Sequence, residues 1–178
     1  MARKKPGRRY SKNWGGRRPG AGRPPKPDAG APHLARPDLD GDSPVHVWWT
    51  TRDDVPSLRS PKIAKLIRES LKAGAERFGC LVAYYGIDRD RIDLICESDD
   101  AEALSRCLQG LSVRIARGVN SALDRNGKVF DDRYRSRLLA DRATLKDALT
   151  RIASAKSKGE VHKPTTRRLR DGWKRVTS

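Results

Sequence analysis

An uninterrupted apolar run of eight residues, Cys80–Ile87 (CLVAYYGI), constrains the fold of this chain more than any other feature. A run of this length and composition is typical of a buried central strand. The next residues, Asp88-Arg89-Asp90, favour a turn, and Arg91–Cys96 (RIDLIC) then returns as a second strand. The pattern therefore predicts a β-hairpin inside a larger sheet.

Patterns on either side of this hairpin complete the expected fold. Alternating apolar residues predict a further strand, and apolar residues at three- and four-residue steps predict helices, with Ser60 and Thr144 as candidate caps. These elements are expected as a strand at 45–49, helices at 61–78 and 101–125, a strand at 129–139 and a helix at 144–155. The order β-α-β-β-α-β-α is the ferredoxin-like pattern with one helix added. We therefore expect an α+β fold whose four-stranded antiparallel sheet has helices on one face and a free opposite face.

Positive charge is concentrated at the two ends of the chain. Residues 1–26 hold ten Lys or Arg and no acid, and residues 156–178 hold eight basic residues against two acidic ones. The net charge is +17, while the residues between the two ends are close to neutral. We therefore expect a flexible Gly/Pro/Arg-rich tail at 1–43, a folded domain at 44–155 and a basic tail at 156–178. Basic tails neutralise phosphates and release counterions, which favours a nucleic acid partner.

Other classes of protein fit the sequence less well. No apolar run approaches the roughly 18 residues of a membrane-spanning helix, and the basic N-terminus lacks the apolar core of a signal peptide. The Gly/Pro-rich N-terminal segment is also unsuited to an amphipathic membrane helix. Cys80, Cys96 and Cys107 form no metal motif and are expected to pack as small apolar residues. These features predict a cytoplasmic protein that makes no membrane contact. A bacterial-type, nucleoid-associated localisation and a monomeric or homodimeric state are further expectations that these features do not themselves decide.

Several segments in order resemble one family. They are GGRRPGAGRP, PVHV, PSLR, ERFG, LSRCLQGLSVRIARGVN, GKVFDDRY and the expected last helix. Together they resemble the REP-associated tyrosine transposases, which are stand-alone relatives of the single-tyrosine HUH insertion-sequence transposases. The resemblance covers about residues 14–155 and is most specific at 104–120 and 127–134. It implies a ferredoxin-like fold, DNA transposition, and cleavage of single-stranded DNA beside a hairpin.

The resemblance also implies a catalytic site, and here the chain departs from the family. A His-hydrophobic-His pair on a central strand would hold a divalent metal that polarises the scissile phosphate. This chain has Arg91 and Asp93 at the two histidine positions, and an arginine has no lone pair to donate. None of His33, His46 and His162 replaces the pair. The resemblance therefore implies a lost metal site, with no catalytic residue, no metal ligand and no cofactor.

The nucleophile of the family is a tyrosine on the last helix, and Arg151 stands at about that position in this chain. No tyrosine follows Tyr134, which lies outside the nucleophile's segment. Tyr84 and Tyr85 lie in the central strand, but an isolated phenol of pKa about 10 is a poor nucleophile. Loss of the metal ligands together with the nucleophile favours a pseudoenzyme that has kept DNA binding.

Arginines supply the candidate DNA-binding residues. Three of them alternate along the expected fourth strand and should share one face, as a phosphate-contacting stripe or as a solvated edge. The candidates are Arg17, Arg18, Arg23, Arg114, Arg117, Arg133, Arg135 and Arg137. Because Trp48 and Trp49 are adjacent in a strand, one should be buried and the other exposed, where it could stack on a base.

Three functions remain open at this point. The first is a catalytically inactive DNA-binding protein that recognises hairpin or single-stranded DNA. The second is an active transposase or nickase with a rearranged site built on Asp93 and a strand tyrosine. The third is an RNA-binding module, because a bare sheet with basic tails also suits single-stranded RNA.

Overall fold

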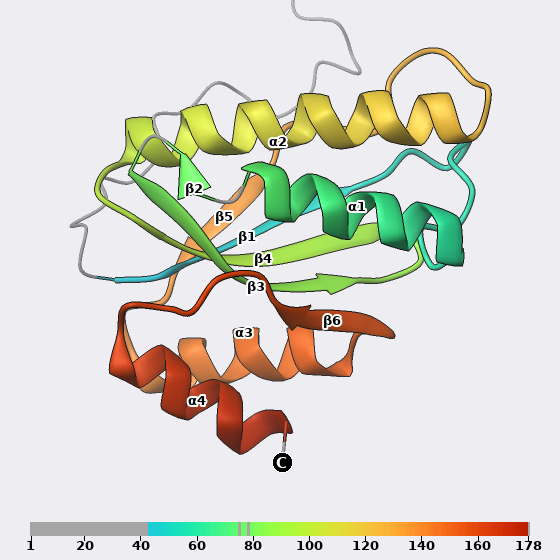
Figure 1. The fold of residues 1–178 in the computed structure, drawn as a ribbon. Coiled ribbons are helices and arrows are strands. Elements are labelled where there is room, and N and C mark those ends of the chain that lie inside the picture. The colour runs from blue at the N-terminus through green and yellow to red at the C-terminus, as the bar shows by residue number, and fades with distance from the viewer. Residues whose placement is uncertain (1–42, 75, 78, 178) are drawn as a thin grey trace, which may run out of the picture. The chain divides into compact units, whose positions relative to one another are not determined.

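One antiparallel sheet organises the computed structural model, which describes residues 43–74, 76–77 and 79–177 (Figure 1). The strand order is β2-β3-β4-β1-β5, and β6 pairs with β3. The strands are β1 (Val45–Thr50), β2 (Glu76–Arg77), β3 (Cys80–Ile87), β4 (Arg91–Ser98), β5 (Arg135–Leu138) and β6 (Ser157–Glu160). The expected tail at 1–43 lies, apart from Ser43, outside the described residues.

The predicted hairpin and the ferredoxin-like order are both confirmed, but within the described residues β2 and β6 extend the expected four-stranded sheet to six strands. β3 and β4 pair antiparallel at the centre, and β1 lies between β4 and β5. The β3–β4 register shifts between Val82 and Tyr84, so the strand carries a bulge at this point. The fourth strand is shorter than predicted, since the region before Arg135 contributes only an isolated bridge between Thr51 and Phe130.

Helices α1 (Pro61–Gly74) and α2 (Ala101–Ala122) cover one face of the sheet, as predicted (Figure 1). The Asp100 carboxylate caps α2 by accepting a 2.7 Å hydrogen bond from the Ala103 amide. α1 ends at Gly74 and not at 78, because the following residues leave the helix and pair with β3 as β2. α2 ends at Ala122 and not at 125, and Asp124 and Gly127 then turn the chain with positive φ angles of 49° and 103°.

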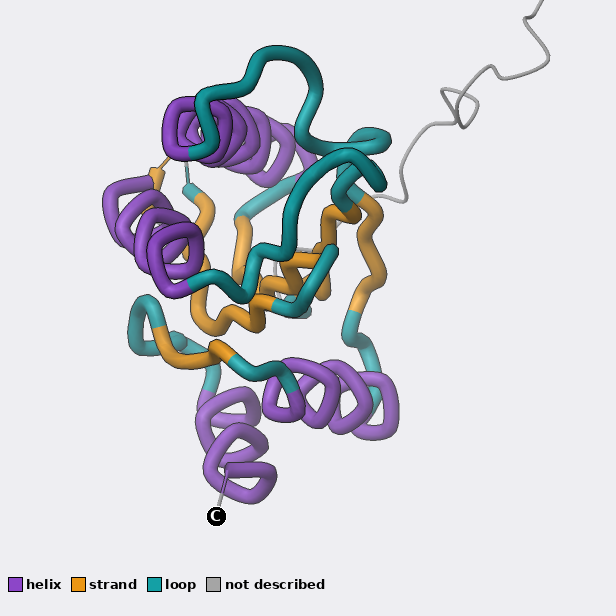
Figure 2. The backbone as a smooth tube through the Cα atoms, turned by 90° about the vertical axis from the view of Figure 1, so that its right-hand side faces the viewer, coloured by secondary structure: helices purple, strands orange, loops and turns teal. Residues whose placement is uncertain are grey.

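The opposite face of the sheet is not free, in contrast to the expectation from sequence. Helices α3 (Arg142–Ser154) and α4 (Arg167–Thr177) lie on it, so that the strands run between two pairs of helices (Figure 2). A second apolar cluster forms here, in which Tyr84 and Ile95 of the sheet meet Leu149 and Ile152 of α3. α3 starts earlier than predicted, because its cap is the Asp141 carboxylate, which accepts from the amides of residues 143 and 144 at 2.8 Å each.

Residues 156–177 are folded and do not form the tail expected from their charge. β6 pairs with Tyr84–Ile87, and the rings of Tyr84 and Trp173 stack with centroids 4.3 Å apart. The Glu97 carboxylate on β4 accepts hydrogen bonds from the Thr165 amide (2.7 Å) and the Thr166 amide (2.9 Å) just before α4. Buried aromatic and apolar contacts thus outweigh the charge of this segment. No helix among the described residues has the length and apolar character needed to cross a membrane.

Candidate nucleic-acid interface

A buried carboxylate, Asp93 on β4, lies at the centre of the candidate site. Only 3% of the residue is exposed, on the side of the sheet that faces α3. Its oxygens accept hydrogen bonds from Arg91 Nε (2.9 and 3.0 Å) and Arg91 Nη2 (2.7 Å). His46 Nε2 lies 2.8 Å from Oδ1, and because a carboxylate only accepts, this nitrogen carries the proton of the bond. Asp93 therefore holds two basic side chains in fixed positions.

Strand register brings these groups together. Trp48 of β1 lies opposite Asp93 of β4, and His46 and Arg91 are each two residues away on the same face. The Arg91 guanidinium lies 4.8 Å from the centroid of the Trp48 ring, a cation–π contact. The His46 ring also lies beside Trp48, with the two ring centroids 5.0 Å apart. The side chains thus support one another on the sheet surface.

The electrostatics of the cluster favour the ionised carboxylate. Burial by itself would raise the pKa of Asp93. The hydrogen bonds from His46 and Arg91, together with the positive charge of Arg91, outweigh burial and hold the pKa of this carboxyl below its ordinary value. Asp93 is therefore an anion at neutral pH.

Arg151 of α3 reaches the same cluster, with its Nε 3.8 Å from Asp93 Oδ2. The structure thus places together the three positions at which the resemblance implies lost catalytic residues, Arg91, Asp93 and Arg151. The sequence did not reveal His46 as a partner of Asp93, because the two are 47 residues apart and meet only through the β1–β4 register.

A small cavity of about 260 Å³ opens beside this cluster, between strands β5, β1 and β4 and one side of α3. Three arginines contribute to its wall and only one acidic residue, Asp147, does so. The lining residues are His46, Arg91, Arg137, Leu139, Thr144, Asp147, Ala148 and Arg151. Guanidinium groups match the geometry of phosphate oxygens with paired N–H donors. The cavity is therefore suited to a phosphate group.

A divalent metal does not fit these residues. Arg91 occupies one of the two implied ligand positions with a permanent positive charge, and the oxygens of Asp93 already accept from Arg91 and His46. Within the ranges that the structure describes, no three His, Cys, Asp or Glu side chains gather as a metal site requires.

The other predicted DNA-binding arginines divide between two faces. Arg135 and Arg137 are exposed on β5 and pair with Trp48 and His46, so both share the face of the cluster. Arg133 is exposed just before the strand. Arg114 and Arg117 are exposed on α2, on the opposite side of the sheet. Arg17, Arg18 and Arg23 lie outside the described residues.

The aromatic residues of the sheet serve the core more than an exposed surface. The sequence predicted that one of the two adjacent tryptophans would be buried and the other exposed. Trp49 is buried as predicted, but Trp48 is only half-exposed, because the Arg91 guanidinium lies over its ring. Tyr84 is buried against Trp173, and burial raises the pKa of its phenol further. Tyr85 and Tyr134 belong to the apolar cluster on the α1/α2 face, away from Asp93. The three cysteines are buried with free thiols, as predicted.

Comparison with known proteins supports the fold alone. No family model matches the chain, and no curated protein matches it. The structure of a REP-associated tyrosine transposase bound to a REP hairpin is similar, with a TM-score of 0.53 and 9% identity over 67% of this chain and 69% of that chain. The crystal structure of a candidate transposase from Deinococcus radiodurans R1 aligns with a TM-score of 0.47 and 16% identity over 66% of this chain and 92% of that one. The first of these two similarities supports a transposase-like α+β fold for this chain.

Proposed function

We propose that this protein is a catalytically inactive relative of the REP-associated tyrosine transposases that binds hairpin or single-stranded DNA. The observation that carries the proposal is the convergence of Arg91, Asp93 and Arg151 in one ion-pair cluster. Cleavage in the family needs a metal held by histidines and a nucleophilic tyrosine at these positions. In this chain Arg91 stands at a histidine position and Arg151 at about the tyrosine position, so each brings a fixed positive charge. The site has the charge to hold a phosphate and lacks the groups to break its ester bond.

Phosphate binding in the small cavity rests on Arg137 and Arg151. The Arg151 side chain is about half exposed (48%), whereas that of Arg91 is 24% exposed and is held by Asp93. Asp93 contacts only Nε and Nη2 of Arg91, and a guanidinium has five N–H donors in all. The basic residues at 1–26 add affinity without sequence preference. Such a protein would act in the cytoplasm on the nucleoid.

The decisive experiment combines binding and cleavage on one substrate. A labelled DNA hairpin with single-stranded flanks is incubated with the protein and Mg²⁺ or Mn²⁺, then run on native and denaturing gels. We expect a shifted complex, no cleavage and no covalent adduct. A protein–DNA adduct at any tyrosine would refute the proposal, and the absence of binding would refute it as well.

Charge-removing variants locate the contact. Arg137→Gln and Arg151→Gln should each weaken hairpin binding by about tenfold, the effect of losing one charge-assisted hydrogen bond. Arg114→Gln and Arg117→Gln, on the opposite side of the sheet, are the matched controls. They should have little effect, which would set aside the expectation from sequence that these two arginines bind DNA. Deleting residues 1–26 should weaken binding and flatten its salt dependence. Equal losses for all four substitutions would mean that binding reflects overall charge alone.

The two alternative functions are less well supported by the geometry. A rearranged nickase needs a tyrosine near Asp93, yet the tyrosines within the described ranges pack into the two apolar clusters. The RNA-binding alternative assumed a bare sheet, and α3 and α4 cover the face in question. Competition between DNA and RNA hairpins of one sequence tests the second alternative.

A further inference from the structure

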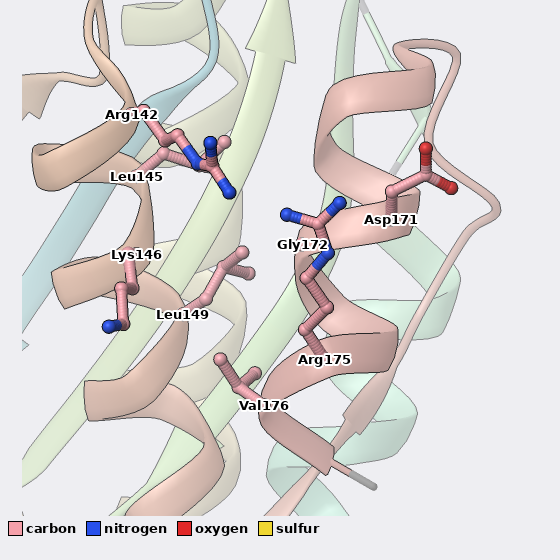
Figure 3. A pocket seen from close by; sticks show the side chains of 8 residues that line it. All are labelled: Arg142, Leu145, Lys146, Leu149, Asp171, Gly172, Arg175 and Val176. Atoms are coloured by element: carbon pink, nitrogen blue, oxygen red, sulfur yellow. The ribbon is translucent and has the colours of Figure 1, made fainter.

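A second cavity, of about 530 Å³, lies on the other side of α3 from the small cavity, between α3 and α4. Its size falls within the range of small-molecule binding sites. Figure 3 shows the residues of α3 and α4 that line it, with Leu149 and Val176 between the two helices and the Asp171 carboxylate turned away from α3. Nothing in the proposed binding at Arg137 and Arg151 uses this groove.

The floor of the groove is apolar. Leu145 and Leu149 of α3 and Val176 of α4 line it. The helices approach closely at Gly172, where a Cβ atom would lie 2.7 Å from Leu149 Cδ1. This close approach leaves no room for a side chain at Gly172, and the groove forms a slot between the two helices.

The rim of the groove is basic. Arg142 and Lys146 contribute from α3 and Arg175 from α4, and the guanidinium groups of Arg142 and Arg175 face one another across the gap (Figure 3). Asp171 is the one acidic residue among the lining residues, and its carboxylate pairs with Arg167 at 3.5 Å. The groove thus combines an apolar slot with an excess of positive charge at its mouth.

We propose that this groove holds the base of an unpaired nucleotide, with the adjoining phosphates bound by Arg142, Lys146 and Arg175. This inference rests on the proposed function and adds a second contact to it. Flipped bases are held in pockets between aromatic or apolar side chains, while basic side chains follow the phosphate backbone. Because α3 also supplies Arg151 to the small cavity, a strand that crosses α3 reaches both sites.

The charge of the groove also selects against other occupants. The segment 1–26 of this chain carries ten basic residues and no acid, so the basic rim repels it. An acidic amphipathic peptide has suitable charge, but it would not depend on bases in the DNA. Base dependence is therefore the property that separates a nucleotide from a peptide in this groove.

The experiment compares two hairpins that differ only in their single-stranded flanks, one of thymidines and one of abasic sites. Both carry the same phosphates, so the ratio of their dissociation constants measures base binding. For the wild-type protein we expect the abasic flank to bind about fivefold more weakly, because it has no base to bury against the apolar floor of the groove. Val176→Trp fills the slot and should reduce this ratio to near one. Val113→Trp, at an exposed valine of α2, is the matched control and should leave the ratio unchanged.

Two further variants test the phosphate contacts at exposed positions, where a substitution should leave the fold intact. Lys146→Gln and Arg175→Gln are surface changes and should weaken both hairpins alike, because they remove phosphate contacts. A wild-type ratio of one, or a ratio that Val176→Trp leaves unchanged, overturns the groove proposal, including the case in which a peptide is the true occupant. If binding still depends on Arg137 and Arg151, the proposed function survives that result. If neither hairpin binds at all, the proposed function is refuted, and the groove proposal that rests on it is refuted as well.

Discussion

Replacing Asp93 by Asn removes the charge that holds the arginine cluster together, and the structure gives the size of the effect. The Asp93 side chain is 5% exposed and accepts bonds of 2.7–3.0 Å from Arg91 and His46. Each hydrogen bond to a charged group contributes about 1.5–3 kcal/mol. Asn keeps one acceptor oxygen but turns an NH₂ group towards a cation. The partial exposure of Arg91 lets water compensate for some of the loss, so we expect the free energy of unfolding to fall by about 3 kcal/mol.

The pH dependence of this loss follows from the lowered pKa of Asp93. A carboxyl whose pKa is lower in the folded state stabilises the fold fully above its unfolded pKa of about 4. This stabilisation disappears as the pH falls through the folded pKa, because protonation removes the negative charge of Asp93 just as the Asn substitution does. The difference between wild type and Asp93→Asn should therefore be constant from about pH 5 to 8 and shrink in more acidic solution.

Urea unfolding, followed by tryptophan fluorescence at several pH values, measures the loss in the free energy of unfolding and its dependence on pH. Thermal unfolding gives an independent check through Tm. A loss of about 3 kcal/mol corresponds to a drop of roughly 6–12 °C in Tm for a domain of this size. Combining Asp93→Asn with Arg91→Gln should cost less than the sum of the single changes, since both remove the same ion pair. A loss below about 1 kcal/mol, or one that does not shrink below about pH 5, would show that the cluster is not a stabilising unit.

Three other expectations concern neighbouring features. Asp93→Asn should bind the DNA hairpin at least as tightly as wild type, because the cations lose an internal competitor, and weaker binding in a gel shift would argue against a phosphate site. Glu97→Gln should lower the stability of the fold by about 1 kcal/mol and speed hydrogen exchange of the amides in α4, whereas unchanged exchange would mean that the carboxylate does not anchor this helix. Trp173→Ala should cost about 2 kcal/mol in thermal unfolding, because the ring stacked on Tyr84 is half-buried, and a neutral result would mean that α4 is loosely attached.

The sequence predicted the elements whose apolar pattern is unambiguous. The run Cys80–Ile87 and the alternation at 45–49 led to β3 and β1, and the helical steps of 101–125 led to α2. The covered second face was missed because the basic composition of 156–178 concealed an apolar stripe. Leu169, Trp173 and Val176 recur at four- and three-residue steps on α4, and this spacing was the signal available.

The candidate site was only partly predictable for a different reason. Arg91 and Asp93 are two residues apart on one strand, so their shared face followed from the strand itself. Arg151 came from alignment on the family, and its distance from Asp93 needed the placement of α3 on the sheet. His46 could not be assigned, because a shift of one residue between β1 and β4 would have turned it to the opposite face.

The two outer edges of the sheet limit how copies of the chain can associate. Two short strands share the edge of β3, β2 at Cys80 and Leu81 and β6 at Tyr84–Ile87. At the other end of the strand path, β5 presents exposed Arg135 and Arg137, and charged side chains on an edge strand oppose pairing with another molecule. Continuation of the sheet from one copy into the next is thereby disfavoured at both ends. Under the proposed function, copies on one DNA molecule would then be spaced by the positions of their binding sites along the nucleic acid.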